Sequence, residues 1–157
     1  MAHNIYGVIT SFTYEGDLPN VVLAEGYHLI PLESTEEAGS SEKPVAPYGA
    51  LLKGTTAVIR ELSFLGKCAY IETAYFGGIG TQIAETWLEG KRIEGPLISY
   101  DGVEPKIKFG HVAVVDGAIN QALRHLGVQS SEEADEFDVV GLGRYRSNRK
   151  IFAESGH

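Results

Sequence analysis

The feature that most constrains the fold is the segment 68–88, in which two runs rich in β-branched and aromatic residues flank the loop Gly77-Gly78-Ile79-Gly80. Runs of this composition around a glycine loop are typical of a β-hairpin. A second turn follows at Glu89-Gly90, and a further run, 92–99, leads away from it. The segment therefore predicts a three-stranded antiparallel meander at the centre of the molecule.

Two predicted turns, a four-residue loop at 77–80 and a two-residue turn at 89–90, fix a register for the three strands. Because side chains alternate between faces along a strand, this register sorts the sheet into two faces. The apolar face is predicted to carry Ala69, Ile71, Thr73, Tyr75, Ala84, Thr86, Leu88, Ile93 and Leu97. The opposite face is predicted to carry Tyr70, Glu72, Glu85, Trp87, Arg92 and Glu94. One apolar and one charged face is typical of an antiparallel sheet with one solvated side.

The register also predicts a row of carboxylates, with Glu72, Glu85 and Glu94 side by side across the three strands. Like charges placed directly opposite each other destabilise a sheet, and three interpretations remain open. The face is solvated and screened, or it is covered by arginines of the tail, or it is a binding surface for a metal ion, a basic partner or a cationic ligand. The arginines available for a cover are Arg144, Arg146 and Arg149.

The rest of the chain predicts further strands and helices around the meander. Strands are expected at 5–14, 21–24, 27–32 and 106–115, and helices at 54–66, 118–126 and 132–137. Asp116 is expected to cap the second helix, and Ser130-Ser131-Glu132-Glu133 is a capping box for the third. This order indicates an α+β fold, a mainly antiparallel sheet with a central three-stranded meander and two to three helices packed on one face. The helix 54–66 is expected on the apolar face.

The length of 157 residues predicts a single domain covering 1–157. Residues 33–50, with Pro44, Pro47 and four glutamates, are expected to form a mobile loop. Residues 148–157 are expected to be a flexible tail whose deletion leaves the melting temperature nearly unchanged. Because an acidic stretch, 132–138, precedes a basic one, 144–150, Arg144 or Arg146 is expected to fold back onto carboxylates.

Composition argues against several classes of protein. The formal net charge of −8 and the pI near 5.1 argue against nucleic-acid binding, which normally shows a basic face. An acidic surface favours solubility instead, or association with a basic protein partner. No apolar run approaches the roughly 20 residues of a membrane span, and the first residues do not form a signal peptide. The single cysteine, Cys68, lies in an apolar run and predicts a buried, unreactive thiol. A cytoplasmic location is expected.

Few residues point to chemistry. The glycine loop could cradle an anion, but no Lys-Ser/Thr pair follows it and it joins two strands, so a structural loop is the favoured interpretation. The five histidines show no metal-ligand spacing, and no nucleophile elbow is present. Catalytic residues are therefore not identified, and neither a cofactor nor a metal is expected.

The motif Ala74-Tyr75-Phe76-Gly77-Gly78-Ile79-Gly80-Thr81-Gln82, followed by Trp87, resembles a group of small bacterial proteins of unknown function. The segments 26–32 and 135–146 resemble the same group, which brings no established activity with it. The expected function is that of a non-enzymatic acidic binding protein, by analogy of the immunity type that neutralises toxins. The alternative is a small enzyme or small-molecule-binding domain with a site near the glycine loop and the glutamate row; homo-oligomers are compatible with both. The candidate binding surface is Tyr70, Glu72, Gly77, Gly78, Gly80, Gln82, Glu85, Trp87, Arg92, Glu94, Arg144 and Arg146.

Overall fold

The structure, a computed structural model, describes residues 2–32, 53–102 and 112–154. Its strands are β1 (Tyr6–Thr10), β2 (Val21–Val22), β3 (His28–Pro31), β4 (Cys68–Phe76), β5 (Ile79–Leu88), β6 (Lys91–Asp101) and β7 (Ala113–Val114). Its helices are α1 (Lys53–Leu65), α2 (Ala118–His125), α3 (Glu136–Val140) and α4 (Asn148–Glu154), with the 3-10 turns η1 (Ala24–Gly26) and η2 (Leu142–Arg144). The predicted mobile loop 33–50 lies outside the described residues, as do 106–111 of the predicted strand 106–115.

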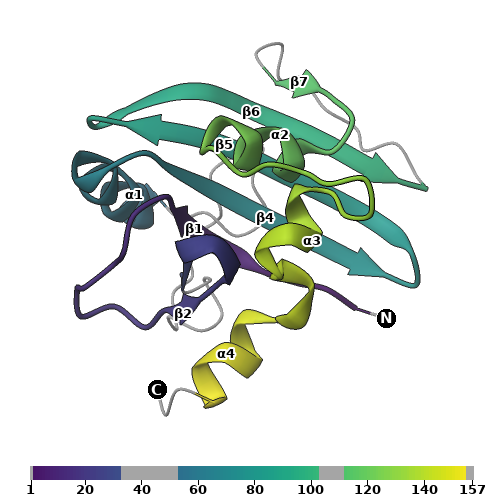
Figure 1. Cartoon of the computed structure of the whole chain (residues 1–157), viewed down its shortest axis with the longest axis horizontal. Coiled ribbons are helices and arrows are strands. Elements are labelled where there is room, and N and C mark those ends of the chain that lie inside the picture. Colours follow the sequence, from purple (N-terminus) through teal and green to yellow (C-terminus); the bar gives the residue numbers. More distant parts are fainter. Residues whose placement is uncertain (1, 33–52, 103–111, 155–157) are drawn as a thin grey trace.

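The strands form one seven-stranded sheet in the order β2-β3-β1-β4-β5-β6-β7 (Figure 1). All neighbouring strands are antiparallel except β6 and β7, which run parallel. The long strands β4, β5 and β6 are consecutive in the chain and adjacent in the sheet. The predicted α+β class, the mainly antiparallel sheet and the central meander are therefore confirmed.

The turn between β4 and β5 is tighter than predicted. Only Gly77 and Gly78 form the loop, and both have positive φ, 62° and 84°, as a two-residue type I′ hairpin turn requires. Phe76 consequently pairs with Ile79 rather than with Thr81. The register of β4 on β5 is shifted by two residues from the prediction, and since side chains alternate with period two, the faces of the strands are unchanged.

The turn between β5 and β6 is the predicted one. Glu89 and Gly90 have φ of 52° and 80°, again the type I′ geometry, and Trp87 pairs with Arg92 as predicted. The ladder then becomes irregular, so that Thr86 faces Glu94 and the next regular pair is Ala84 with Leu97. This β-bulge in β6 was not predicted, and it displaces Glu94 from the position opposite Glu85.

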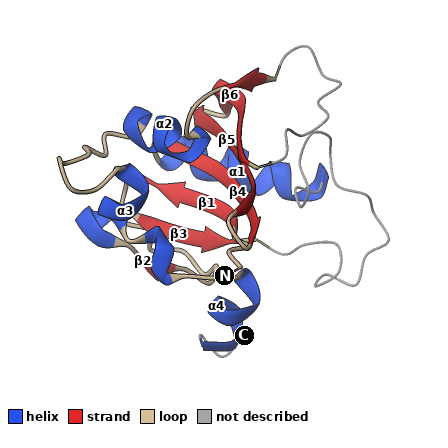
Figure 2. Ribbon diagram, turned by 90° about the vertical axis from the view of Figure 1, so that its right-hand side faces the viewer, coloured by secondary structure: helices blue, strands red, loops and turns tan. Residues whose placement is uncertain are grey.

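Both faces of the sheet are buried, each against a different helix. One core, under α2 and α3, contains Ile5, Ile9, Leu29, Ala69, Ile71, Ala84, Leu97, Ile119, Leu123, Val140, Leu142 and Ile151. The other core, under α1, contains Tyr6, Val8, Ile30, Leu32, Ile59, Leu62, Cys68, Tyr70, Ile83, Trp87 and Ile98. Figure 2 shows α2 and α3 on one side of the sheet and α1 on the other. The predicted packing of two to three helices on one face holds for α2 and α3, whereas α1, which was expected on the same face, covers the face expected to be solvated.

Two helix starts and the C-terminal segment also differ from the prediction. Gly117, not Asp116, precedes α2 as its N-cap, and α3 begins at Glu136 after an Asp135 cap whose side chain accepts from the Asp138 N–H. The expected flexible tail begins instead with α4. There the Asn148 amide nitrogen donates to the carbonyls of Tyr6 and Leu32, each at 2.7 Å.

Candidate functional site

A cavity of about 340 Å³ opens where the β4–β5 hairpin, the N-terminal segment and the chain after α3 meet. It lies on the face of the sheet that α2 and α3 cover, because its strand residues share that face with Ala69 and Ala84. Its lining residues are His3, Thr73, Tyr75, Gly78, Gln82, Asp101, Phe137, Gly143 and Arg146. The volume is at the lower end of the range of small-molecule sites, which is about 300–1,000 Å³.

One wall of the cavity is a row across three strands, in which Tyr75 pairs with Gly80 and Gly80 pairs with Asp101. The Tyr75 hydroxyl crosses over Gly80 and donates to Asp101 Oδ2 at 2.9 Å. A Cβ atom added at Gly80 would lie 2.7 Å from Cγ of the Tyr75 ring. A side chain is therefore excluded at Gly80, and its absence lets the tyrosine reach the aspartate two strands away.

Tyr75 is protonated at neutral pH, and its surroundings raise its pKa further. Burial raises the pKa of Tyr75 to about 12, with further contributions from the hydrogen bond to Asp101 and from its charge, while a hydrogen-bonding contact with Gln82 acts in the opposite direction. Gln82 is itself fixed, since its Oε1 accepts the Ile119 N–H at 3.1 Å at the start of α2. At neutral pH this wall presents a phenol that donates and a carboxylate that accepts.

A second wall is the imidazole of His3. The N-terminal segment runs beside β4, where the backbones of His3 and Tyr75 exchange hydrogen bonds of 3.0 and 2.9 Å. His3 Nε2 contacts the Leu142 carbonyl at 3.4 Å, and since a carbonyl only accepts, Nε2 carries the proton. Nδ1 then accepts from the Thr73 hydroxyl at 2.6 Å. Burial lowers the pKa of His3, against the effect of the Leu142 carbonyl and together with that of Arg146, so the ring is neutral.

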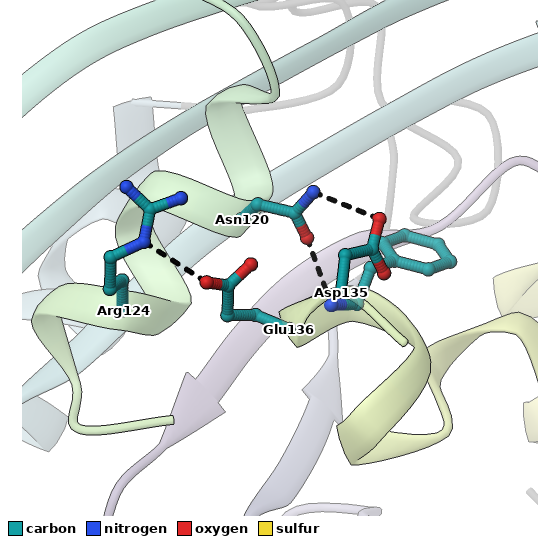
Figure 3. Close-up of polar contacts among 5 residues, drawn as sticks. Asn120, Arg124, Asp135 and Glu136 are labelled. Atoms are coloured by element: carbon teal, nitrogen blue, oxygen red, sulfur yellow. Dashed lines mark hydrogen bonds and ion pairs between the residues drawn. The ribbon is translucent and has the colours of Figure 1, made fainter. Parts of the chain in front are cut away.

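The aromatic wall is Phe137, whose ring centroid lies 5.5 Å from that of His3. Its position depends on α2, because Asn120 Oδ1 accepts the Phe137 N–H at 2.9 Å and Asn120 Nδ2 donates to Asp135 at 3.1 Å (Figure 3). Beside this pair, Arg124 Nε donates to the buried Glu136 carboxylate at 3.0 Å. The short helix α3 is thus held by α2, and Phe137 with it.

Arg146 supplies the cation of the cavity. Its side chain is half-buried, and its backbone carbonyl accepts the Asn4 N–H at 2.7 Å. Within the described residues the ion pairs are Arg92–Glu85 and Arg124–Glu136, so the Arg146 guanidinium has no carboxylate partner there. The expectation that Arg144 or Arg146 pairs with carboxylates is therefore wrong for the part of the chain that the structure describes.

The structure divides the predicted binding surface between two places. Gly78, Gln82 and Arg146 line the cavity, with Gly77 in the adjoining turn and Gly80 beneath Tyr75. The remaining predicted residues lie elsewhere: Tyr70, Glu72, Glu85, Trp87 and Arg92 on the α1 side, Glu94 beside Gln121 of α2, and Arg144 exposed. Sequence reasoning missed His3, Thr73, Tyr75, Asp101, Phe137 and Gly143. Strand alternation was the one available signal, since it places Thr73 and Tyr75 on the same face as Gln82.

The predicted row of carboxylates does not form. Glu72 pairs with Ile83, and Glu85 pairs with Tyr70. Both glutamates are buried, with 8% and 1% of their surface exposed, so the solvated-face interpretation was wrong. The Trp87 indole N–H donates to Glu85 at 2.8 Å and Arg92 lies 3.3 Å from the same carboxylate, and the Tyr70 hydroxyl donates to Glu72 at 2.7 Å. These carboxylates are partnered components of the α1-side core.

Cys68, in the same core, has no exposed surface. Burial raises the pKa of its thiol to about 12, with a further contribution from the charge of Glu85. The thiolate, which is the reactive form, is therefore suppressed, as the sequence predicted for this position.

Within the described residues no group of three histidine, cysteine or acidic side chains is arranged to hold a metal ion. No helix in the described ranges has the length and apolar character needed to cross a membrane. Comparison with family models, with curated proteins and with solved structures gives no match.

Proposed function

We propose that this protein is a non-enzymatic binding protein that takes a small organic anion into the cavity beside the β4–β5 hairpin. The observation that carries the proposal is the half-buried Arg146 guanidinium, which lines the cavity without a carboxylate partner in the described part of an acidic protein. A guanidinium presents its N–H groups in a fork that matches the two oxygens of a carboxylate or phosphate. An anion entering the cavity would supply the missing partner.

Binding without chemistry fits the remaining groups. The His3 imidazole has both nitrogens occupied, by Thr73 and by the Leu142 carbonyl, and is not free to act as a base. The Thr73 side chain is itself buried, with 2% exposed surface, so its hydroxyl is no nucleophile for a ligand in the cavity. Tyr75, with a pKa of about 12, holds its proton. Each group positions its neighbours and none is prepared to transfer a proton.

The proposal is tested by titrating ¹⁵N-labelled protein with propionate, benzoate and inorganic phosphate. We expect the amide resonances of Thr73, Gly78 and Gly143 to shift first. Arg146→Gln should weaken binding about tenfold or more, since hydrogen bonds to a charged group contribute about 1.5–3 kcal/mol. Arg144→Gln is the matched control, because Arg144 is exposed and does not line the cavity.

A cavity-filling variant gives an independent test. A Cβ atom at Gly143 would have its nearest neighbour, a Phe137 ring carbon, at 3.8 Å, and the Gly143 backbone is not left-handed. Gly143→Leu should therefore fold and exclude the same anions. Equal binding by the parent protein, Arg146→Gln and Gly143→Leu would refute the proposal.

A second candidate function is recognition of a basic protein partner by the hairpin tip. The net charge of −8 favours a basic partner, and the immunity-type role is the one expected by analogy. It is favoured by Phe76 and Ile79, which face each other beside the turn and expose 79% and 54% of their surface. Clusters of large exposed apolar residues are typical of protein interaction sites. A partner recovered from lysate and lost on Phe76→Ser, but retained on Arg146→Gln, would assign the function to the tip. Both proposals keep the expected cytoplasmic location.

A further inference from the structure

The cavity contains charges of both signs that do not pair with each other. Asp101 and Arg146 both line it, yet they form no ion pair. Asp101 is exposed and Arg146 is half-buried, and an ion pair at such an exposed position contributes only about 0–1 kcal/mol. Both charges are therefore available to a ligand that carries the opposite charges.

Asp101 is held from the side of the sheet. It ends β6, its Oδ2 accepts from Tyr75, and Tyr75 is fixed above Gly80 by the close packing of its ring. The second oxygen, Oδ1, has no hydrogen-bond partner within the described residues. The acidic end of the cavity therefore offers one acceptor in a fixed place.

The backbone of Arg146 is held from the opposite side, in the chain between η2 and α4. Its carbonyl accepts the Asn4 N–H at 2.7 Å, and Asn148, two residues later, is fixed by hydrogen bonds to Tyr6 and Leu32. These contacts fix the backbone at Arg146, whose side chain lines the cavity. Phe137 and His3 form an aromatic wall of the same cavity.

We propose that the ligand is a small zwitterion of the amino-acid class, whose carboxylate binds Arg146, whose ammonium binds Asp101 and whose side chain lies against Phe137. This inference rests on the proposed function and specifies its ligand. A dipolar molecule carries a partner for both charges, whereas a simple anion leaves Asp101 without a counter-charge. The expected discrimination is therefore that of one charge-assisted hydrogen bond.

The test uses the full chain and a panel of the common L-amino acids, each measured by amide chemical-shift titration. For the tightest-binding amino acid, two matched probes are added: the deamino acid, which keeps the carboxylate, and the decarboxylated amine, which keeps the ammonium. The amino acid should bind at least about tenfold more tightly than either probe, as expected for one additional charge-assisted hydrogen bond.

Two variants separate the ends of the cavity. Asp101→Asn should remove the preference for the amino acid over its deamino acid, and Arg146→Gln should remove the preference over the amine. Asp116→Asn, at another exposed aspartate outside the cavity, is the matched control and should change neither. Because Asp101 is exposed, its substitution should leave the fold intact, which the amide spectrum reports directly.

If the deamino acid binds as tightly as the amino acid and both are lost on Arg146→Gln, the zwitterion inference is overturned while the proposed anion binding stands. If neither carboxylate probe binds, or Arg146→Gln changes nothing, both fail. If only the amine binds tightly, and Asp101→Asn abolishes this binding, the inference is also overturned, and the site prefers cationic ligands.

Discussion

The face of the sheet under α2 and α3 is packed with alanine, isoleucine and leucine, whereas the face under α1 buries tyrosine, tryptophan and glutamate. On the first face the charges that line the cavity stand at its edge, as Asp101 and Arg146 do. On the second, Glu85 lies inside the core and is hydrogen-bonded by Trp87 and Arg92. A charged residue that alternates with apolar ones therefore does not by itself indicate solvent, because a carboxylate with enough donors can be buried.

The two faces should also respond differently to mutation. The α2/α3 face is stabilised by buried volume, so its losses should follow the size of the side chain removed. The α1 face is stabilised in part by paired polar groups, so a change of charge without a change of shape should be costly. The cavity, at the edge of the α2/α3 face, should be sensitive to pH.

The largest effect is expected from deleting residues 148–157. The deletion removes Ile151, which is 2% exposed in the α2/α3-side core, and the hydrogen bonds of Asn148. Loss of a buried isoleucine costs about 2–5 kcal/mol, and buried carbonyls left without a donor add about 1–3 kcal/mol. Urea denaturation should show a loss of more than about 3 kcal/mol, whereas Arg149→Ala, at an exposed position of α4, should cost less than about 0.5 kcal/mol. A deletion that costs less than about 1 kcal/mol would show that α4 adds nothing to that face.

Glu85→Gln tests the α1 face at constant volume, and we expect a loss of about 2 kcal/mol. The amide cannot accept from Trp87 and Arg92 together without turning a donor toward one of them, and hydrogen bonds to charged groups are worth about 1.5–3 kcal/mol. Glu61→Gln, on the exposed side of α1, is the control and should be nearly neutral. If Glu85→Gln stabilises the protein, the desolvation free energy of the buried carboxylate exceeds the stabilisation from its hydrogen bonds to Trp87 and Arg92.

The meander was predictable from sequence because its determinants are local. Each of the two turns is fixed by a pair of residues with positive φ, and three of these four residues are glycines. In β4 and β5 strand alternation assigned the faces correctly even though the first loop was predicted two residues too long, since a shift of two residues preserves the face of every side chain. For the same reason the face pattern could not reveal the error in loop length, because the apolar and charged residues of β4 and β5 fall on the same faces in either register. In β6 strand alternation failed at Glu94, because the bulge turns this residue to the α2 side.

The side on which α1 packs could not be predicted in this way. Apolar stripes of a helix fit any buried face, and Tyr70 and Trp87 are as good a surface for Ile59 and Leu62 as the aliphatic face is. The cavity was out of reach for a different reason. His3 and Arg146 lie near opposite ends of the chain and meet only because the N-terminal segment pairs with Tyr75 and with Arg146.

The smallest expected effect is a pH dependence that belongs to the cavity wall of the α2/α3 face. Burial lowers the pKa of His3 in the folded protein, while the unfolded chain should titrate near the ordinary value of about 6.5. As the pH falls below that value, the unfolded state binds a proton while His3 in the folded state stays neutral. The stability that neutral His3 contributes is therefore present above about pH 6.5 and is lost as the pH falls toward the folded pKa. Urea denaturation of the parent protein at pH 7.5 and pH 5.5 should therefore show a larger acid loss than His3→Gln, which keeps every other titratable group. Because the difference between the two proteins isolates one imidazole, an equal loss in both would mean that His3 titrates in the folded state as it does in the unfolded chain, and that the contacts with Thr73 and Leu142 do not hold the ring neutral.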